Sequence, residues 1–354
     1  MKNAMARPTL AGVLVAGLLC SALTTPASAA QAAPETITTP ALGAALTTML
    51  KQGTVPSTES RKDRASVAAS ANDLTGDGID DVIARDRATT RLDIFAGSGS
   101  LNGTATLSGP SQVRASTPNR AWFGQGDLNG DGRNDVASID SFGVMYAAYN
   151  QGTVAGVPQL STDTSVLAGF TPSSPICLTD FVGSDPNNPL EPDGRADIII
   201  KNASTKAIDL YVNDGMVNGK PAYSYRGQLL TAADYVTGIH LADLTSDYFK
   251  DILVTMTDGS LWMLDLFADV DSSGKPVAKW FKVVGSGMNT ADHILFPDFN
   301  RDDYPDFAAR LTASGELRGV LHSGAWNPAA PDKVFNPATG QLVKSGWSNY
   351  DWVF

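Results

Sequence analysis

The sequence predicts an all-β protein, a β-propeller built from four-stranded antiparallel blades. Three observations favour this fold. An acidic nine-residue motif recurs five times, short apolar and β-branched runs flank each copy, and glycine is frequent, with 33 residues in a chain of 354. Short apolar runs separated by turns rich in glycine, asparagine and aspartate are typical of strands, and four strands in each repeat correspond to one propeller blade.

The acidic motif sets the period of the fold. Its ninth residue is always aspartate, and successive copies are separated by 54, 62, 54 and 55 residues. A recurring period of this kind indicates a repeat architecture. The long interval arises in the third copy, where nine extra residues separate Asp180 from Asp193. The five ninth residues are Asp81, Asp135, Asp197, Asp251 and Asp306.

Five copies predict five blades in residues 66–354, although six or seven blades are also compatible with the sequence. Residues 350–354 resemble one more copy of the strand that precedes a motif. We therefore expect this segment either to close the ring against the first blade or to begin an incomplete extra blade.

The strands of each blade are expected in a fixed order around the motif. One short apolar run precedes each motif, at 66–70, 121–124, 176–179, 238–242 and 293–296. A second, β-rich run follows it directly, at 82–84, 136–139, 198–200, 252–255 and 307–310. A third run lies one turn later, at 91–96, 143–149, 207–212, 260–267 and 316–321. A weaker fourth strand is expected before the next motif, for example at 280–284.

The N-terminal part of the chain has a different composition. A short basic start precedes an apolar run at 10–23, and small residues follow at 27–30, an order typical of a cleavable signal peptide. We expect residues 1–30 to be removed on export and the mature chain to be secreted and extracellular. Residues 31–65 are rich in alanine, threonine, proline and serine, and we expect a flexible arm or linker there, in which 41–51 could form a short helix.

Charge and cysteine content exclude several classes of protein. The formal net charge of −11 argues against nucleic acid or an anionic membrane surface as a partner. Cys20 would leave with the signal peptide, and Cys177 lies in an apolar strand, so we expect a buried, unreactive thiol and no intramolecular disulfide. The mature chain is expected to be a monomer that does not contact membranes.

The acidic motif itself predicts a Ca²⁺ site. In its clearest copy, at 127–135, it reads Asp-Leu-Asn-Gly-Asp-Gly-Arg-Asn-Asp. Side-chain oxygens at positions 1, 3, 5 and 9 and the carbonyl at position 7 are the hard ligands that Ca²⁺ prefers, and glycine at position 6 permits a sharp turn. The simpler interpretation is an aspartate-rich turn, but a turn does not require a third carboxylate. An EF-hand is disfavoured, because position 12 is never glutamate in the uninterrupted copies and strands follow each loop.

These repeats resemble the FG-GAP/VCBS repeats of secreted and integrin-type β-propellers, over roughly residues 66–320. The resemblance implies one Ca²⁺ in each intact loop, and Phe123-Gly124 is the best match to the family's Phe-Gly tag. The implied ligands in the first, second and fifth loops are Asp73, Thr75, Asp77, Ile79 and Asp81; Asp127, Asn129, Asp131, Arg133 and Asp135; and Asp298, Asn300, Asp302, Tyr304 and Asp306. The residue at position 7 would contribute its carbonyl.

The third and fourth loops depart from the pattern. The corresponding residues are Asp180, Asp193, Arg195 and Asp197 in the third loop, and Asp243, Thr245, Asp247, Phe249 and Asp251 in the fourth. We expect weaker binding in the third loop, because its insertion separates two ligands. In the fourth loop, Tyr248 replaces glycine and Thr245 is a weaker ligand than asparagine.

Resemblance also suggests a partner. The chain is similar in size and plan to exported bacterial propellers of the dispase-autolysis-inducing kind, which act on neutral metalloproteases and are cross-linked by a secreted transglutaminase. This similarity implies a non-enzymatic protein that binds another extracellular protein. Gln31 and Gln52 in the N-terminal arm could serve as acyl donors.

The alternative is a carbohydrate-active propeller, either a glycosidase, a polysaccharide lyase or a lectin-like binding module. His240, His293 and His322 occur in no metalloprotease or hydrolase motif, so we assign no catalytic residue. Trp326 and Trp347, in the C-terminal stretch, and the polar insertion at 183–192 are candidate binding surfaces. The other interpretation of these tryptophans is that their rings fill the space between blades.

Overall fold

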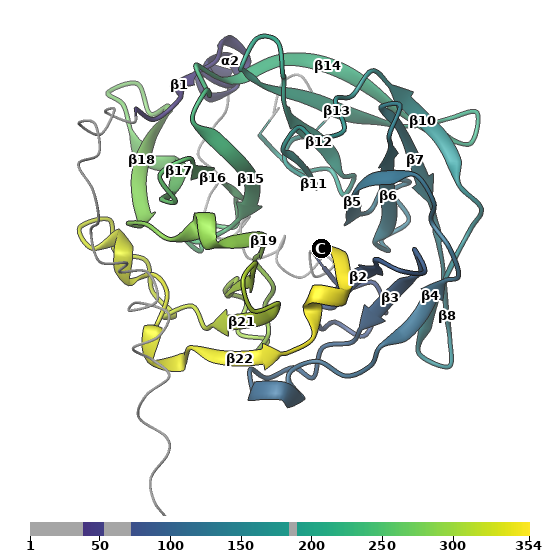
Figure 1. The fold of residues 1–354 in the computed structure, drawn as a ribbon. Helices are drawn as coiled ribbons and strands as arrows, with labels where there is room; N and C mark the ends of the chain where they lie inside the picture. The colour runs from purple at the N-terminus through teal and green to yellow at the C-terminus, as the bar shows by residue number, and fades with distance from the viewer. Residues whose placement is uncertain (1–37, 53–71, 184–189) are drawn as a thin grey trace, which may run out of the picture.

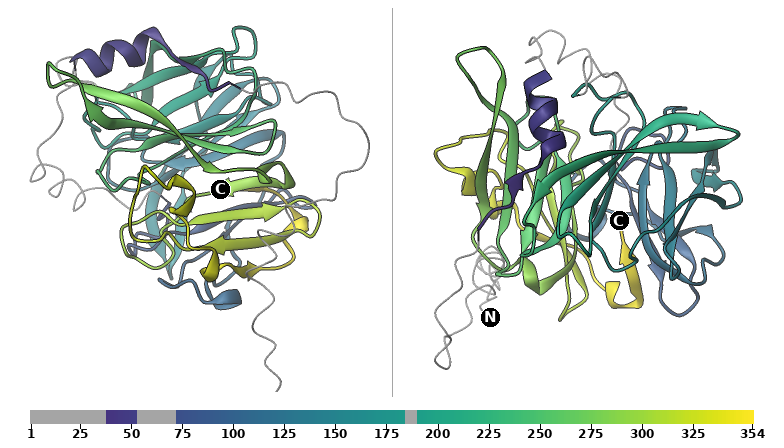
Figure 2. Two further views of the ribbon diagram at one scale, coloured as in Figure 1. Left: turned by 90° about the vertical axis from the view of Figure 1, so that its left-hand side faces the viewer. Right: turned by 90° about the horizontal axis from the view of Figure 1, so that it is seen from above.

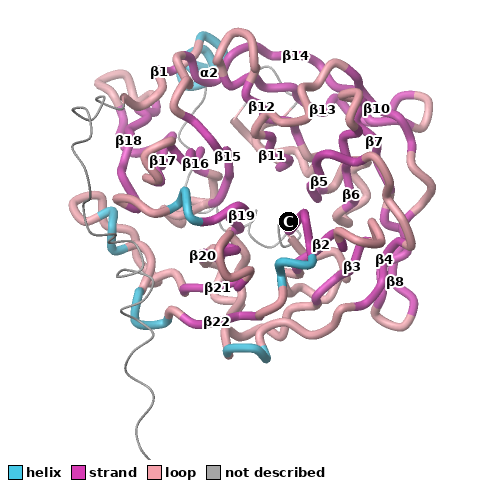
Figure 3. The backbone as a smooth tube through the Cα atoms, in the orientation of Figure 1, coloured by secondary structure: helices cyan, strands magenta, loops and turns pink. Residues whose placement is uncertain are grey.

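The computed structural model describes residues 38–52, 72–183 and 190–354. The predicted signal peptide, the first predicted strand at 66–70 and residues 184–189 of the insertion lie outside the described residues. Five antiparallel sheets stand around a central axis (Figure 1), and strands dominate while helical segments are short (Figure 3). The predicted all-β propeller is therefore confirmed, with five blades.

Each blade runs from an innermost strand to an outermost one. Blade 1 is β23 (Tyr350–Val353), β2 (Val82–Asp86), β3 (Leu92–Phe95) and β4 (Ser111–Arg114). Blade 2 is β5 (Arg120–Gly126), β6 (Asp135–Asp140), β7 (Val144–Ala148) and β10 (Thr164–Ala168). Blade 3 is β11 (Ile176–Thr179), β12 (Asp197–Lys201), β13 (Ile208–Val217) and β14 (Lys220–Thr231). Blade 4 is β15 (Val236–Ala242), β16 (Asp251–Met256), β17 (Leu261–Val270) and β18 (Pro276–Val284). Blade 5 is β19 (Ala291–Leu295), β20 (Phe307–Leu311), β21 (Glu316–Val320) and β22 (Gln341–Lys344).

Smaller elements decorate the blades. A two-stranded hairpin, β8 (Asn150–Val154) and β9 (Val157–Leu160), extends blade 2. The helical elements are α2 (Ala44–Gln52) and the 3₁₀ turns η1 (Gly103–Ala105), η2 (Met288–Thr290), η3 (Pro331–Lys333), η4 (Pro337–Thr339) and η5 (Trp347–Asn349). No helix among the described residues is long and apolar enough to cross a membrane.

The C-terminal strand closes the ring. β23 pairs with β2, with Val353 opposite Ala84, and Ile83 and Phe354 exchange backbone hydrogen bonds of 2.8 and 2.9 Å. The ring of Phe354 stacks on Phe123 of blade 2, with 5.6 Å between centroids. Of the two outcomes that the sequence left open for residues 350–354, closure against the first blade is the one observed.

The core lies between neighbouring blades. Each inner strand is covered on both faces by adjacent sheets, so apolar residues run continuously instead of alternating; Ile198, Ile199 and Ile200 are all buried. Trp347 belongs to this core, at 1% exposure, and packs on Phe95 with 4.6 Å between ring centroids. Of the two interpretations that the sequence left open for Trp347, the observed one is a ring that fills the space between blades, so Trp347 does not form a binding surface.

Part of the predicted flexible arm belongs to the propeller. β1 (Ala41–Leu42) pairs with the outer edge of β14, and helix α2 covers the outside of blades 3 and 4 (Figure 2). Leu46, Met49 and Leu50, which recur at helical spacing, are buried in the core between these two blades. Residues 38–52 thus differ from the expected linker, whereas the short helix expected at 41–51 is present as α2. Gly43 permits the close approach, since a Cβ there would lie 2.1 Å from the Gln228 carbonyl oxygen.

Candidate metal-binding loops

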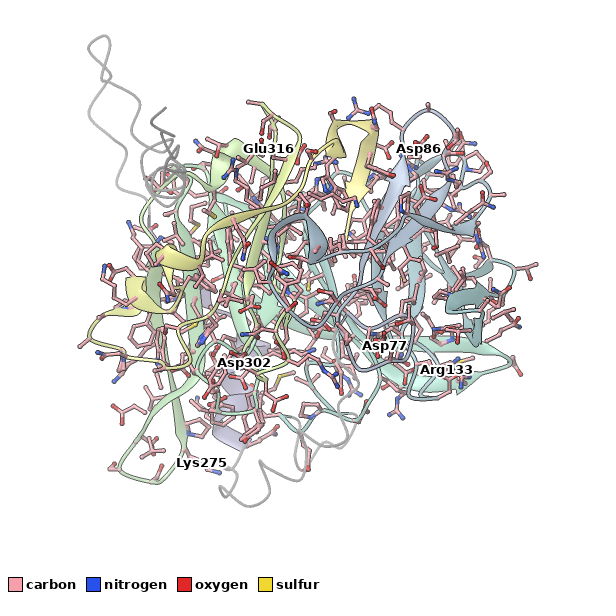
Figure 4. All side chains as sticks on the ribbon, turned by 90° about the horizontal axis from the view of Figure 1, so that it is seen from below. Asp77, Asp86, Arg133, Lys275, Asp302 and Glu316 are labelled. Atoms are coloured by element: carbon pink, nitrogen blue, oxygen red, sulfur yellow. The ribbon has the colours of Figure 1, made fainter. Side chains whose placement is uncertain are left out.

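The five acidic loops lie on one face of the ring. The second to fifth loops each connect the innermost strand of a blade to the next strand outward, and the first loop leads into the equivalent strand β2, so all five lie at the same end of the sheets. Figure 4 shows Asp77, Arg133 and Asp302 on this side, and Asp86 and Glu316 on the opposite side. We call these two surfaces the acidic face and the opposite face.

The first aspartate of each loop organises the turn. In the second loop, the N–H groups of Gly130 and Gly132 each donate to one carboxylate oxygen of Asp127, at 2.7 Å. The first loop repeats this arrangement around Asp73, with Gly76 and Gly78 as donors at 2.6 and 2.8 Å. The first carboxylate therefore sits inside the loop and accepts from positions 4 and 6.

The ninth aspartate anchors the loop to its own blade. Asp135 is fully buried, and its two oxygens accept from the N–H of Leu128 at 3.0 Å and of Asn150 at 2.7 Å. Asp306 is also fully buried and accepts in the same way from Phe299 and His322, at 3.0 and 2.8 Å. This carboxylate joins the start of the loop to the end of the third strand.

The middle positions complete the acidic cluster. In the second loop, the side chain of Asp131 accepts from the Asn129 amide at 3.2 Å and from the Arg133 guanidinium at 2.5 Å. In the fifth loop, Asp302 accepts from the Asn300 amide at 2.8 Å and from the Tyr304 N–H at 3.0 Å. Arg133 also donates to the Asn150 carbonyl at 2.9 Å, so its side chain contacts the loop as well.

The loops gather the predicted residues without preforming a metal centre. Among the residues that the structure describes, no three acidic, histidine or cysteine side chains converge as a group that could hold a metal ion. The carboxylates at positions 1 and 9 accept instead from different backbone N–H groups, as Asp127 and Asp135 do. Convergence of the predicted side-chain and carbonyl ligands on one ion therefore stays a prediction.

The third loop keeps its geometry in spite of the insertion. The N–H groups of Asp193 and Gly194 donate to the two oxygens of Asp180, at 3.0 and 2.8 Å, as the equivalent groups do in the intact loops. Asp197 is fully buried and accepts from Val182 and Asn213, both at 2.9 Å. The nine extra residues therefore do not separate Asp180 from Asp193 in space.

Glycine is not required at the sharp turns of the last two loops. Tyr248 and Asp303 occupy position 6 with φ of 69° and 65°, the left-handed conformation that Gly132 adopts at 81°. Their N–H groups donate to the first aspartates, Asp243 and Asp298, at 2.7 and 2.9 Å. The hydrogen bonds to the first aspartate are thus retained although a side chain makes this conformation costly.

Burial leaves the loops with poorly solvated negative charge. It raises the pKa of Asp135 and of Asp306 to about 7 and that of Asp81 to about 6, in each case against the lowering effect of backbone N–H donors. The neighbouring carboxylates, such as Asp127 beside Asp135, raise it further. A bound cation would offset this repulsion.

Three residues outside the predicted sites, Asn150, Asn213 and His322, join one loop to the next blade. The side-chain amide of Asn150 donates to the Leu74 carbonyl of the first loop at 2.8 Å, and Asn213 donates to Leu128 of the second loop at 3.0 Å. His322 is hydrogen-bonded to the Leu244 carbonyl of the fourth loop at 3.2 Å. These residues follow the ninth aspartate by 15 or 16 positions, which is a signal that the sequence contains.

We predict that Asn213→Ala lowers the free energy of unfolding by about 3 kcal/mol, because it leaves several buried backbone groups without partners. Asn213 is fully buried, and besides its bond to Leu128 its side chain accepts from the Gly215 N–H at 3.0 Å. Urea denaturation followed by intrinsic fluorescence measures this difference. Asn327→Ala, at an exposed turn, is the matched control and should change stability by less than about 1 kcal/mol. Equal effects of the two substitutions would contradict the assigned role of Asn213.

We predict that the metal-free chain loses stability as the pH rises from about 4 to about 7. The folded pKa of Asp135 and of Asp306 lies near 7, above the ordinary 3.8, so the folded state binds more protons than the unfolded state across this interval. The stabilisation is fully present below the unfolded pKa and is lost as the pH rises through the folded pKa. Thermal melts in metal-depleted buffers measure the trend, and a melting temperature that rises steadily towards pH 7 would contradict it.

The fold and the loops define a five-bladed β-propeller with an acidic motif in every blade. Residues 73–138 match the family model described as FG-GAP-like repeat, which covers the first loop, the strands β2, β3, β4 and β5 and the second loop. This match confirms the resemblance to FG-GAP repeats that the motif predicts. No curated protein is significantly similar to the chain in sequence.

Proposed function

We propose that the chain is an exported, calcium-stabilised and non-enzymatic propeller that binds another extracellular protein through its acidic face. The proposed partner is a neutral metalloprotease, whose autolysis or activity the propeller modulates. The propeller fold and the FG-GAP-like repeat are compatible with a protein-interaction module. One observation carries the choice of surface: three extended hairpins with apolar tips stand beside the acidic loops.

The loops have the donor set that Ca²⁺ requires. In the second loop, Asp127, Asn129, Asp131, Asp135 and the carbonyl of Arg133 would hold the ion, and all of them contribute oxygen. Existing hydrogen bonds do not exclude this role, because each carboxylate oxygen has two lone pairs and can accept from an N–H while it binds a cation. A bound Ca²⁺ would supply positive charge where burial leaves the carboxylates poorly solvated.

The hairpins extend consecutive blades. They are β8–β9 of blade 2, the far end of β13–β14 in blade 3 and the far end of β17–β18 in blade 4. Their tips carry the exposed aliphatic residues Val154, Val217 and Val270, at 65%, 55% and 52% exposure. Figure 4 shows Lys275, in the third hairpin, on the same side as Asp77 and Asp302. We infer that these exposed aliphatic side chains, each at a hairpin tip beside the acidic loops, contact a protein partner.

The hairpins are held by the loops. The N–H of Asn150, at the base of the first hairpin, donates to Asp135, and the N–H of Asn213, in the second, donates to Asp197. The Tyr149 hydroxyl donates to the Gly219 carbonyl at 3.3 Å and thereby joins the first two hairpins. Ion binding to the loops would therefore rigidify the proposed binding surface.

A pull-down with a thermolysin-type metalloprotease tests the proposal. The mature chain should bind the protease in calcium buffer and change the rate at which the protease loses its intact band. The triple variant Val154→Asp, Val217→Asp, Val270→Asp should weaken binding at least tenfold. Phe142→Asp is the matched control, because Phe142 is 84% exposed in the turn between β6 and β7 on the opposite face. An untouched, unbound protease, or release of products from a polysaccharide panel, would contradict the proposal.

Cross-linking by a transglutaminase is a separate part of the proposal. Gln52 is exposed at the C-terminal end of helix α2, whereas Gln31 lies outside the described residues. A labelled primary amine should be incorporated at one or both positions. Incorporation that persists in a chain carrying both Gln31→Asn and Gln52→Asn would contradict this assignment.

A further inference from the structure

A recurring cation joins neighbouring blades on the opposite face. Four residues after the ninth aspartate, blades 1, 3 and 5 carry Arg85, Lys201 and Arg310. Each of these donates to a carbonyl of the first residue of the next blade's innermost strand. The bonds run from Arg85 to Arg120 at 2.5 Å, from Lys201 to Val236 at 2.7 Å and from Arg310 to Tyr350 at 2.6 Å.

In two of these blades, the cation also pairs with a carboxylate of its own innermost strand. Arg85 donates to Asp351 at 2.8 Å, and Arg310 donates to both oxygens of Asp292 at 2.7 Å. Both aspartates lie at register shifts beside the residue that pairs with the arginine. The arginine and aspartate therefore form a repeated unit at the junction between blades.

Blade 4 has lost this unit. In blade 4 the residue equivalent to Arg310 is Thr255. Thr255 pairs with Gly238 across the sheet, as Arg310 pairs with His293 in blade 5. Thr237 occupies the register shift where blade 5 has Asp292, and the hydroxyls of Thr237 and Thr255 lie 3.3 Å apart. Two short neutral side chains therefore replace a long cation and its counter-ion. In blade 2, by contrast, this position is the buried Ile139, opposite Trp122.

A cavity of about 330 Å³ lies where the cation of blade 4 would extend. Its lining includes Thr237, Thr255 and Thr257 from blade 4, and Asn289, Ala291 and Asp292 from blade 5. Ala291 is the first residue of β19, the position whose carbonyl accepts the cation in the other junctions. The cavity thus keeps the oxygen acceptors of the junction although the residue that used them is absent.

The charges around the cavity favour a cation. Asp292 is ionised, because Arg310 and His293 lower its pKa, and its side chain remains 36% exposed. Arg310, its ion-pair partner, is only 4% exposed, so the carboxylate faces the solvent side more than the guanidinium does. His240 in the wall is neutral at pH 7, since burial lowers its pKa to about 4.

We propose that this cavity between blades 4 and 5 binds a guanidinium group, which takes the place of the missing arginine. The group is supplied either by a small free guanidinium compound or by an arginine side chain of another protein. Hydroxyl, amide and carboxylate oxygens of the lining accept its N–H groups, and Met256, Met288 and Ile294 contact its alkyl part. The site lies on the opposite face, away from the acidic loops.

Binding of methylguanidinium to the mature chain, followed by NMR chemical shifts or calorimetry, tests this inference. We expect saturable millimolar binding, at least tenfold tighter than that of methylurea, which has a similar shape without the charge. The tripeptide acetyl-Gly-Arg-Gly-amide distinguishes the two sources. Affinity at least tenfold above that of methylguanidinium assigns the site to an arginine side chain, whereas equal or lower affinity assigns it to a free compound. No binding of either cation at 10 mM, or equal binding of methylurea, would overturn the proposal.

Three variants test whether methylguanidinium binds in the cavity between blades 4 and 5. Thr255→Arg should fill the cavity from within, raise the melting temperature and weaken methylguanidinium binding at least tenfold. Asn289→Lys, at an exposed position, introduces a competing cation without burying it, and should weaken binding even if the first variant folds poorly. Thr312→Arg adds the same charge at an exposed position of blade 5 outside the lining and should leave binding unchanged. Wild-type affinity in both Thr255→Arg and Asn289→Lys would contradict the assigned location.

Discussion

Deletion of residues 350–354 is expected to leave a chain with no cooperative thermal transition, because it opens the propeller ring. These residues form the innermost strand of blade 1, and they bury Val353 at 2% exposure and place Trp352 and Phe354 against other blades. Full burial of an apolar side chain contributes about 1.5–3 kcal/mol, and here Val353 is fully buried while Trp352 and Phe354 are half-buried. Together with the lost backbone pairing of β23 with β2, this is a large part of the stability of an ordinary domain, about 5–15 kcal/mol. Circular dichroism melts of the full and shortened chains measure the effect.

A single substitution in β23 measures how much its packing contributes to stability. Val353→Ala should reduce the free energy of unfolding by about 2 kcal/mol, since it leaves a small cavity between β23 and the core. Val270→Ala, at the tip of the third hairpin, is the matched control and should change stability by less than about 0.5 kcal/mol. A shortened chain that melts cooperatively at the wild-type temperature would show that ring closure does not depend on this strand.

Removal of calcium is expected to lower the melting temperature by about 15 °C or more. An ion held at 100 times its Kd stabilises the folded state by about 2.7 kcal/mol, and several loops act together. Each kcal/mol shifts the melting temperature of a large domain by about 2–4 °C. Scanning calorimetry at pH 7.5, in millimolar Ca²⁺ and in excess chelator, measures the difference. Identical melts in the two buffers would contradict calcium binding.

One loop can be tested at a time. Asp127→Asn keeps a side-chain oxygen for the loop N–H groups but removes one negative charge from the proposed ligands, so it should reduce the calcium-dependent part of the stability. Asp234→Asn removes a charge at an exposed position outside the motifs and should leave that part unchanged. Because the third loop has the same hydrogen bonds as the second, Asp180→Asn should resemble Asp127→Asn. An Asp180→Asn chain that responds like Asp234→Asn would show that the insertion does disable this loop.

Much of the fold follows from local sequence. The five copies of the acidic motif predict five blades, and the apolar runs on both sides of each copy predict the strands, since backbone pairing within blades 2 to 5 is short-range in the chain. The register of Asp135 with Gly126 is an example, because the loop between them determines which residues meet. Residues 350–354 resemble the innermost strands in sequence, and closure of the ring by this segment was one of the two outcomes that this resemblance predicted.

Contacts between segments far apart in the chain could not be predicted from the sequence. The docking of α2 depends on the surface that blades 3 and 4 present to Leu46 and Met49, and composition alone indicated a linker. The amide of Asn213 contacts a loop 85 residues away, and its recurring distance from the ninth aspartate does not indicate which carbonyl it meets. The loss of the cation at Thr255 becomes visible only when the registers of the blades are compared. The convergence of the loop side chains on one ion stays a prediction.

We propose that the five acidic loops are binding sites for a divalent ion. Equilibrium dialysis of the mature chain against radioactive calcium at pH 7.5, with Asp127→Asn and Asp234→Asn in parallel, tests it most directly. We predict at least three and at most five bound ions per wild-type chain, one fewer in Asp127→Asn and no change in Asp234→Asn. Less than one bound ion per chain at millimolar free calcium would contradict the claim.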